Sequence, residues 1–294
     1  MSPTPPRPPR ATCSRTPPRT LTIAGSDSGG GAGIQADLKT FAALGCFGMS
    51  AITAITAQNT RGVTGVHAVP ADMVGAQINA VASDIGVDAA KTGMLGTAAI
   101  VEAVAGAVDR HGIARLVVDP VMISTSGATL SDDSTSAAMV RLLFPRALLV
   151  TPNLPEASYL LGRRIARRGE MEQAAADLLA LGCRAVLLKG GHLEDSEQLD
   201  DLLMRADGSV RVFSHPRIDT RNLHGTGCTL AAAIAAQLAH GARAGEPPDP
   251  ARALDDAVAH ALDYVAAAIA AGTGLELGTG NGPLNHTFAP RALG

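Results

Sequence analysis

The run of five residues from His224 to Cys228 has the composition of an anion-binding site. It reads His-Gly-Thr-Gly-Cys and leads into an alanine-rich segment whose apolar residues recur every fourth position, Leu230, Ile234 and Leu238. This spacing predicts a helix that begins at Thr226. The start of a helix has unpaired N–H groups and the positive end of the helix dipole, and glycines let an oxygen come close to them. We therefore expect a phosphorylated ligand here, although a tight loop with Cys228 as a small buried side chain also explains the run.

Further polar residues follow three apolar runs of the sequence. Asp119 ends one run, Asn153 and Glu156 follow the next, and Lys189 ends a third. Asn153 and Glu156 have the spacing of a capping box, which is a purely structural role. With Asp119 they could instead supply oxygens to Mg²⁺, which prefers a few carboxylates plus phosphate oxygens. Lys189 could contact a phosphate as a point charge or extend into solvent.

The glycine-rich segment 26–33 has the form of a dinucleotide-binding turn. It contributes to a literal GxGxxA match after an apolar run, formed by Gly31, Gly33 and Ala36. That motif also needs an acidic residue about twenty positions later, and none occurs over residues 38–71. The oxidoreductase interpretation is therefore weak. Close packing of a strand on a helix is one alternative, and the flanking Asp27 and Asp37 suggest another, a site for hydroxyl or amine groups.

Short apolar runs alternate with helical patterns through the first two thirds of the chain. The expected strands are residues 21–24, 50–56, 89–92, 116–119, 147–151 and 185–189. Glycines stand where the intervening helices should end, at positions 45, 86, 112, 162 and 182. This alternation predicts an α/β fold of three layers, with a mainly parallel central sheet covered by helices on both faces.

The pattern changes in the last third of the chain. Two short runs about Asp207-Gly208, within residues 200–213, predict an antiparallel hairpin. Helices are expected at 226–240 and 251–271, with a loop at 245–250 between them.

The composition narrows the classes of function. Of 294 residues, 46% are hydrophobic and 17% charged, with a formal net charge of −3. This balance, with two tyrosines, five phenylalanines and no tryptophan, argues against nucleic acid as a partner. No run of about 18 strongly apolar residues predicts a membrane span. Four widely separated cysteines without CxxC spacing indicate a reducing, cytoplasmic compartment. The sequence leaves a homodimer open.

The first nineteen residues form a segment rich in proline and arginine. They contain no apolar stretch of the kind found in a signal peptide. We expect a disordered tail over residues 1–19 and a single domain over residues 20–294.

Taken together, the motifs resemble the hydroxymethylpyrimidine and phosphomethylpyrimidine kinases of thiamine biosynthesis, in the ribokinase-like superfamily. The resemblance covers nearly all of residues 21–290. It rests on segments that occur in the same order as in the family: 24–27 with the glycines after them, 34–39, 57–63, 91–95, the segments of Asp119 and Asn153, 189–192 and 224–229. It implies transfer of the γ-phosphoryl group of ATP to the hydroxymethyl group of 4-amino-5-hydroxymethyl-2-methylpyrimidine. A second transfer, to the monophosphate, would then give the diphosphate.

The resemblance also implies roles for residues of a substrate site. Gln58 would read the aminopyrimidine edge with its amide, which donates and accepts at once. The ring would be lined by three side chains, those of Ala32, Met94 and Val121. Gly25 and Asp37 would complete the pocket.

The remaining implied roles concern the phosphates of ATP. Mg²⁺ and the phosphates would be organised by Asp119, Asn153 and Glu156. Lys189 would lie near the phosphates. The backbone of Gly225, Thr226, Gly227 and Cys228 would stabilise the charge of the transferred group. We expect Cys228 to be the general base, with a thiolate favoured by its place at a helix start.

Two features keep the substrate open. In the glycine-rich turn, Ser28 and Gly29 replace the proline and serine of many family members, which could loosen that loop. Some pyridoxal kinases also have cysteine at the position of Cys228, so pyridoxal phosphorylation is the alternative activity. A catalytically silent ligand-binding protein on the same scaffold is a third interpretation.

Overall fold

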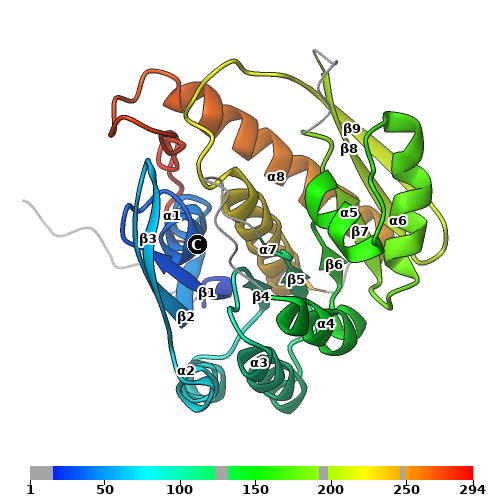
Figure 1. The fold of residues 1–294 in the computed structure, drawn as a ribbon. Helices are drawn as coiled ribbons and strands as arrows, with labels where there is room; N and C mark the ends of the chain where they lie inside the picture. The colour runs from blue at the N-terminus through cyan, green and yellow to red at the C-terminus, as the bar shows by residue number, and fades with distance from the viewer. Residues whose placement is uncertain (1–15, 123–131, 192–197, 246–248, 294) are drawn as a thin grey trace, which may run out of the picture.

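A single nine-stranded sheet runs through the molecule (Figure 1). The computed structural model describes residues 16–122, 132–191, 198–245 and 249–293. The strand order is β3-β2-β1-β4-β5-β6-β7-β8-β9. The six strands from β2 to β7 in this order are parallel, whereas β3 pairs antiparallel with β2 at one edge and, at the other, β8 pairs antiparallel with both β7 and β9. The predicted mainly parallel sheet is confirmed.

The strands and helices have the following bounds. The strands are β1 (Arg19–Asp27), β2 (Phe47–Asn59), β3 (Gly62–Ala68), β4 (Ala89–Thr92), β5 (Leu116–Val118), β6 (Leu149–Val150), β7 (Ala185–Leu188), β8 (Gln198–Arg205) and β9 (Val210–Pro216). The α-helices are α1 (Gly33–Ala43), α2 (Ala71–Asp84), α3 (Ala98–His111), α4 (Asp133–Leu142), α5 (Leu154–Leu161), α6 (Met171–Leu179), α7 (Thr226–Ala244) and α8 (Pro250–Gly272). Two 3₁₀ turns are η1 (Phe144–Arg146) and η2 (Arg168–Glu170).

Helices cover both faces of the sheet, so the three-layer prediction is confirmed. On one face, apolar side chains of α2, α3, α4, α5 and α6 form one core with the strands. On the other face, α1, α7 and α8 form a second core. The central strands β4 to β7 are buried along their whole length, as expected of strands covered on both sides. Figure 1 shows α7 lying against the middle of the sheet with α8 outside it.

The helix ends and the hairpin predicted from glycines are also confirmed. Gly112 and Gly162 are left-handed C-caps of α3 and α5. The other three glycines also have positive φ and lie within two residues of a helix C-cap (Gly45, Gly86 and Gly182). The β8–β9 hairpin turns at Asp207-Gly208, where Gly208 has a φ of 80°.

Two features differ from the prediction. The sequence does not predict β3, because six of its seven residues are polar, small or exposed and show no buried alternation. The boundary of the tail at residue 19 is also wrong. Arg19 is the first residue of β1, and its guanidinium pairs with Asp88 at 2.7 Å. The rest of the expected tail, residues 1–15, lies outside the described residues.

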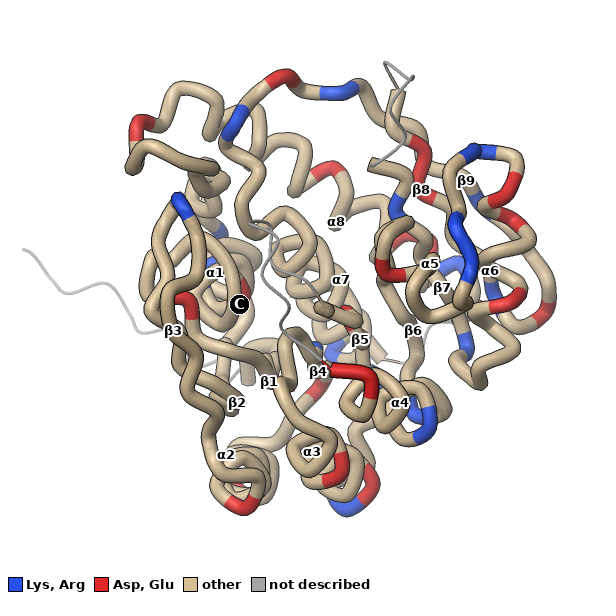
Figure 2. Tube along the Cα trace, viewed as in Figure 1, with Lys and Arg blue, Asp and Glu red and all other residues tan. Residues whose placement is uncertain are grey.

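The surface carries both signs of charge. Figure 2 shows acidic and basic residues interspersed over the helices and loops in view. Within the described ranges, no helix has the length and apolarity needed to cross a membrane.

Candidate active site

The polar residues singled out in the sequence come together at one edge of the sheet. Asp27 ends β1, and Asp119 and Lys189 directly follow β5 and β7. Because these strands are parallel, their carboxyl ends lie at the same edge, where ligands of open α/β sheets bind. α7 begins at this edge as well, since the first residues of α7 contact both the β1–α1 turn and Lys189.

The glycine-rich turn is folded around the carboxylate of Asp27. This side chain accepts hydrogen bonds from the N–H groups of Gly29 (2.7 Å), Gly31 (3.1 Å) and Ala32 (2.8 Å). In a dinucleotide-binding turn such N–H groups would face a pyrophosphate. Here an internal carboxylate takes that place, which provides a structural argument against the dinucleotide interpretation.

Ser28 ties this turn to the strand that carries Gln58. Its hydroxyl donates to the carbonyl oxygen of Gln58 (2.7 Å) and accepts from the N–H of Gln58 (2.8 Å). A side chain on Gly29 would place its Cβ 3.1 Å from a carboxylate oxygen of Asp27. The serine therefore fastens the turn to β2, which argues against the loosening suggested for Ser28 and Gly29.

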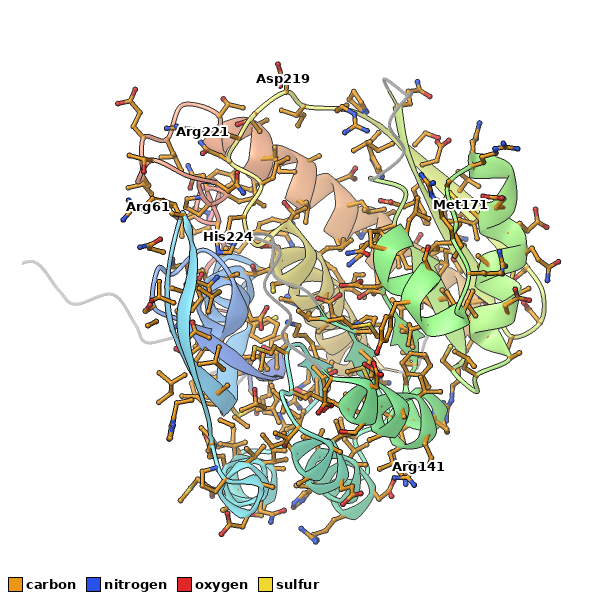
Figure 3. The ribbon with its side chains drawn as sticks, viewed as in Figure 1. Arg61, Arg141, Met171, Asp219, Arg221 and His224 are labelled. Atoms are coloured by element: carbon orange, nitrogen blue, oxygen red, sulfur yellow. The ribbon has the colours of Figure 1, made fainter. Side chains whose placement is uncertain are left out.

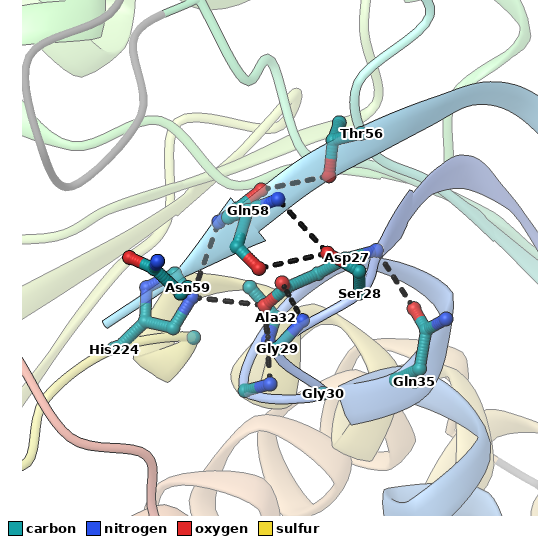
Figure 4. A network of polar contacts seen from close by, with 12 residues as sticks. Asp27, Ser28, Gly29, Gly30, Ala32, Gln35, Thr56, Gln58, Asn59 and His224 are labelled. Carbon is teal, nitrogen blue, oxygen red and sulfur yellow. Dashed lines mark hydrogen bonds and ion pairs between the residues drawn. The ribbon is translucent and has the colours of Figure 1, made fainter. Parts of the chain in front are cut away.

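His224 joins this turn to the start of α7. Its Nε2 lies 3.0 Å from Oδ2 of Asp27 and 3.3 Å from the side-chain amide of Gln58 (Figure 4). Figure 3 shows His224 on the loop that leads into α7. The backbone N–H of His224 donates to Gly282 at 3.0 Å. Segments that are nearly 200 residues apart in sequence thus meet at one side chain.

The start of α7 lies close against the glycine-rich turn on this side. Gly225 is its N-cap and has a φ of 87°, and a side chain there would overlap the carbonyl oxygen of Gly31. Both the left-handed φ and this close approach require glycine.

The other side of the α7 start faces Asp119 and Lys189. The ammonium of Lys189 lies 3.2 Å from Oδ1 of Asp119, which also accepts from the hydroxyl of Thr151 at 3.1 Å. A Cβ on Gly227 would lie 3.4 Å from the Lys189 nitrogen and 3.8 Å from Oδ2 of Asp119. Burial lowers the pKa of Lys189, but Asp119 and Glu156 outweigh it, so the net pKa is raised and the cation is favoured.

Asn153 and Glu156 form the predicted capping box at the start of α5. The N–H of Glu156 donates to Oδ1 of Asn153, and the N–H of Asn153 donates to Oε2 of Glu156, both at 2.8 Å. Burial raises the pKa of Glu156 to about 7, although Lys189 acts in the opposite direction. The structural role of the pair is confirmed, and the carboxylate of Glu156 is near enough to Lys189 for the cation to act on its pKa.

Asp37 does not line an open pocket, which corrects the implied role in direct substrate contact. Its side chain is fully buried, and both oxygens accept from Lys91, at 3.0 and 3.2 Å. Thr22 donates to the same carboxylate at 2.6 Å. Burial raises the pKa of Asp37 and acts against its charge, but three hydrogen bonds from these two donors favour the ionised pair. Asp37 is therefore a support beneath the site.

Cys228 does not have the lowered pKa that its helix position predicts. Burial raises the pKa of the thiol to about 11, against the opposing effect of the Lys91 cation. Asp37 and Asp119 raise it further, and a hydrogen bond from the backbone of Gly33 lowers it. The dipole argument is overcome by desolvation and two nearby carboxylates, so the thiol is protonated at neutral pH.

The expected ring-lining residues are less buried than the residues of the two cores. Ala32, Met94 and Val121 are all half-buried, as is Gln58. Gly25 is buried, and a Cβ there would lie 3.3 Å from the sulfur of Met94. The residues therefore occupy the edge of the site without being sealed into either core.

Three further residues were not assigned a role from the sequence. They are Thr56, Lys91 and His224. Thr56 lies two positions before Gln58 on one strand, a spacing that puts both on the same face and could have indicated contact. Lys91 interrupts an apolar strand, which is itself a signal, because an unpaired buried lysine is rare. The partner of His224 could not be found from sequence spacing.

The fold and the site together define a class of protein. A parallel sheet whose strand ends carry a lysine and carboxylates, facing a glycine-flanked helix start, is the arrangement of an α/β enzyme that handles phosphoryl groups. The comparison with known families gives the particular one. The family model described as phosphomethylpyrimidine kinase matches residues 27–285, and the chain belongs to this family of kinases.

Relatives and solved structures agree with this assignment. A hydroxymethylpyrimidine/phosphomethylpyrimidine kinase of Rhizobium meliloti is 52% identical over 267 residues, covering 90% of this chain and 96% of that protein. The crystal structure of phosphomethylpyrimidine kinase from Clostridium difficile matches with a TM-score of 0.70 and 39% identity, covering 84% of this chain and 99% of that one. The pyridoxal kinase of Staphylococcus aureus, solved with AMP-PCP and pyridoxal, matches with a TM-score of 0.79 and 35% identity, covering 92% and 93%. These matches confirm the ribokinase-like fold.

Proposed function

We propose that this kinase phosphorylates 4-amino-5-hydroxymethyl-2-methylpyrimidine with ATP and then phosphorylates the resulting monophosphate, giving the diphosphate used in thiamine biosynthesis. The observation that carries the proposal is the position of the α7 start. It contacts the Asp27 turn on one side and Lys189 with Asp119 on the other. A helix start between a site for the substrate ring and a site for the phosphates of ATP suits transfer of a phosphoryl group from ATP to the substrate.

The ring would bind beside Gln58, whose amide would read the aminopyrimidine edge. Ala32, Met94 and Val121 would line the ring, and Gly25 leaves room for it. ATP would lie on the opposite side, with Lys189 and Asn153 near its phosphates. The backbone N–H groups of Gly225, Thr226 and Gly227 would stabilise the negative charge on the group in transit.

In the transfer step, the substrate hydroxymethyl oxygen forms a bond to the γ-phosphorus, and the bond from that phosphorus to the bridging oxygen of ADP breaks. The hydroxyl proton must leave as the new bond forms. Cys228 could receive it only as a thiolate, which is scarce at neutral pH when the pKa is about 11. Turnover through this base should therefore grow with pH as the thiolate fraction grows.

The donor set also fits a magnesium ion that arrives with ATP. Asp119 and Glu156 provide two carboxylates close to Lys189. Among the described residues, no three side chains of His, Cys, Asp or Glu cluster as a closed metal cage would. Mg²⁺ commonly takes one or two carboxylates and completes its shell with phosphate oxygens and water. When bound, it would neutralise charge on the phosphates.

Pyridoxal is the second candidate substrate. The specific observation in its favour is the structural match to the Staphylococcus aureus pyridoxal kinase, which has the higher TM-score of the two structures described above. A six-membered heteroaromatic ring with a hydroxymethyl group is common to both substrates, so the same site could serve either.

Mass spectrometry of the products distinguishes the two. The protein is incubated with ATP and either the hydroxymethylpyrimidine or pyridoxal. We expect one and then two phosphoryl groups on the pyrimidine, at a higher kcat/KM than for a single group on pyridoxal. Phosphorylation of pyridoxal alone would reject the proposed substrate, and release of no ADP with either would reject the activity.

A further inference from the structure

The side-chain amide of Gln58 lies between the side chains of His224 and Thr56, and the position of the proton on each of them follows from its other hydrogen bonds. In the structure the amide nitrogen lies 3.3 Å from Nε2 of His224 and the amide oxygen lies 3.1 Å from Oγ1 of Thr56 (Figure 4), but the protons of these two neighbours require the reverse order. The nitrogen and oxygen of an amide exchange places by a half-turn of the terminal torsion, so the neighbouring protons decide which atom faces which group.

The proton on the His224 side follows from Asp27. Nε2 of His224 lies 3.0 Å from Oδ2 of Asp27, and that carboxylate already accepts from three backbone N–H groups. Burial raises the pKa of Asp27, but hydrogen bonds from His224 and the backbone outweigh burial and leave it lowered. An ionised carboxylate only accepts, so Nε2 must carry the proton. A protonated Nε2 has no lone pair, so it cannot accept a hydrogen bond from the amide, and the amide atom that faces it is the oxygen.

The proton on the Thr56 side follows from Ser26. The hydroxyl of Thr56 lies 2.8 Å from the carbonyl oxygen of Ser26, which can only accept. A hydroxyl has a single proton, and this carbonyl takes it. The amide atom that faces Thr56 must therefore donate, which makes it the nitrogen. Two independent neighbours thus require the same orientation of the amide.

We propose that Thr56 and His224, the latter held by Asp27, are positioning residues that lock the Gln58 amide with its oxygen towards His224 and its nitrogen towards Thr56. This lock makes the ring site selective for a heteroaromatic edge with one order of donor and acceptor. The proposal rests on the proposed function in so far as Gln58 reads the substrate edge.

A pair of ligands tests the lock through its chemistry. A 4-aminopyrimidine edge presents an exocyclic N–H donor beside a ring-nitrogen acceptor. In the 4-oxo analogue the exocyclic oxygen accepts and the ring N–H donates, so the order is reversed. A locked amide matches only one of the two edges, whereas an amide free to turn over can match both.

The measurement is the ratio of kcat/KM for the 4-amino substrate to that for the 4-oxo analogue. Thr56→Val removes the acceptor while keeping the shape, and we expect the ratio to fall by about tenfold, the effect of one hydrogen bond to an enforced partner. Thr56→Ser keeps the hydroxyl and should keep the ratio. Thr64→Val is the matched control, because Thr64 is exposed on β3 and its hydroxyl donates to the carbonyl oxygen of Ala57 on β2. A ratio unchanged in Thr56→Val would overturn the lock.

His224 provides the second arm. His224→Gln retains an N–H at the Nε2 position and should keep most of the ratio, whereas His224→Leu should lower it as Thr56→Val does. Equal ratios in His224→Gln and His224→Leu would contradict the role given to the N–H.

Nuclear magnetic resonance separates a failure of this inference from a failure of the proposed function. In the wild-type protein, ¹⁵N shifts should show that His224 carries its proton on Nε2, and the Gln58 amide protons should show contacts to Thr56. These results need no substrate. A proton on Nδ1 alone, or amide-proton contacts to His224 instead, would overturn the lock even if the pyrimidine is phosphorylated. The NMR results as expected with no pyrimidine turnover would reject the proposed function alone.

Discussion

A methyl group on Gly227 tests whether the start of α7 holds the transferred phosphoryl group. Gly227 is the second residue of α7 and its φ is not positive, so alanine can adopt its backbone conformation. The added carbon would lie 3.4 Å from the Lys189 nitrogen and 3.8 Å from Oδ2 of Asp119, which is ordinary contact. The protein therefore accommodates the methyl group, but the methyl group occupies the space that an oxygen of the transferred group would need.

The expected effects on stability and turnover have opposite signs. Replacing glycine by alanine in a helix stabilises the folded protein by about 0.5–1 kcal/mol, which raises the Tm of a domain of this size by roughly 1–3 °C. Blocking a backbone donor that stabilises a developing charge lowers turnover by about 10²–10³-fold. We expect Gly227→Ala to show both, measured as Tm and as the rate of ADP release at saturating ATP and pyrimidine.

Gly241→Ala is the matched control in the same helix. Apart from its chain neighbours and the backbone of its own helix, no described residue comes within 4 Å of the Cβ that this substitution would add. The control should raise Tm by a similar amount and leave turnover unchanged. If Gly227→Ala folds normally and keeps turnover within about threefold of wild type, the start of α7 is not where the transferred group is stabilised.

Three further predictions concern other parts of the protein. Because the pKa of Cys228 is raised to about 11, the thiolate fraction grows about tenfold per pH unit above neutrality, so a thiolate base predicts that kcat rises with pH towards 11. Cys228→Asp should flatten that rise, and Cys228→Ala should lower kcat by roughly 10²-fold or more. A wild-type kcat that does not change with pH would reject Cys228 as the base. Gln58→Leu should raise KM for the pyrimidine by about tenfold and leave KM for ATP unchanged, and the reverse pattern in steady-state kinetics would reject the ring site. Arg19→Ala should lower the free energy of unfolding, measured in urea titrations, by about 1–2 kcal/mol, because it breaks the half-buried pair with Asp88. Deletion of residues 1–15 should leave the free energy of unfolding unchanged. Equal effects of the two changes would contradict the revised boundary.

Local sequence patterns were sufficient for the parts of the fold that local forces decide. The apolar runs became β4 to β7 because a strand covered on both faces is mainly apolar, and the charged exception, Lys91 in β4, is paired with Asp37. The glycines after helices were required by positive φ, and the capping box of Asn153 and Glu156 is closed within four residues. The sequence signal for each of these features lies within a short stretch of the chain.

The features that could not be predicted depend on distant partners. Asp37 was expected in the pocket from the family resemblance and from its place beside the glycine-rich segment, whereas its buried charge is compensated by Lys91, which is 54 residues away. The raised pKa of Cys228 likewise reflects desolvation and carboxylates from other elements, whereas a sequence argument sees only the helix start. The pairing of His224 with Asp27 spans 197 residues. Such contacts require the assembled fold.

The central claim is that the phosphoryl group passes between the two clusters at the start of α7. A crystal structure of this protein with a non-hydrolysable ATP analogue and the hydroxymethylpyrimidine tests it most directly. We predict that the terminal phosphate lies against the backbone N–H groups of residues 225–228, with the hydroxymethyl oxygen facing it and the ring beside Gln58. A terminal phosphate bound away from the start of α7, or a ring bound away from Gln58, would contradict the account.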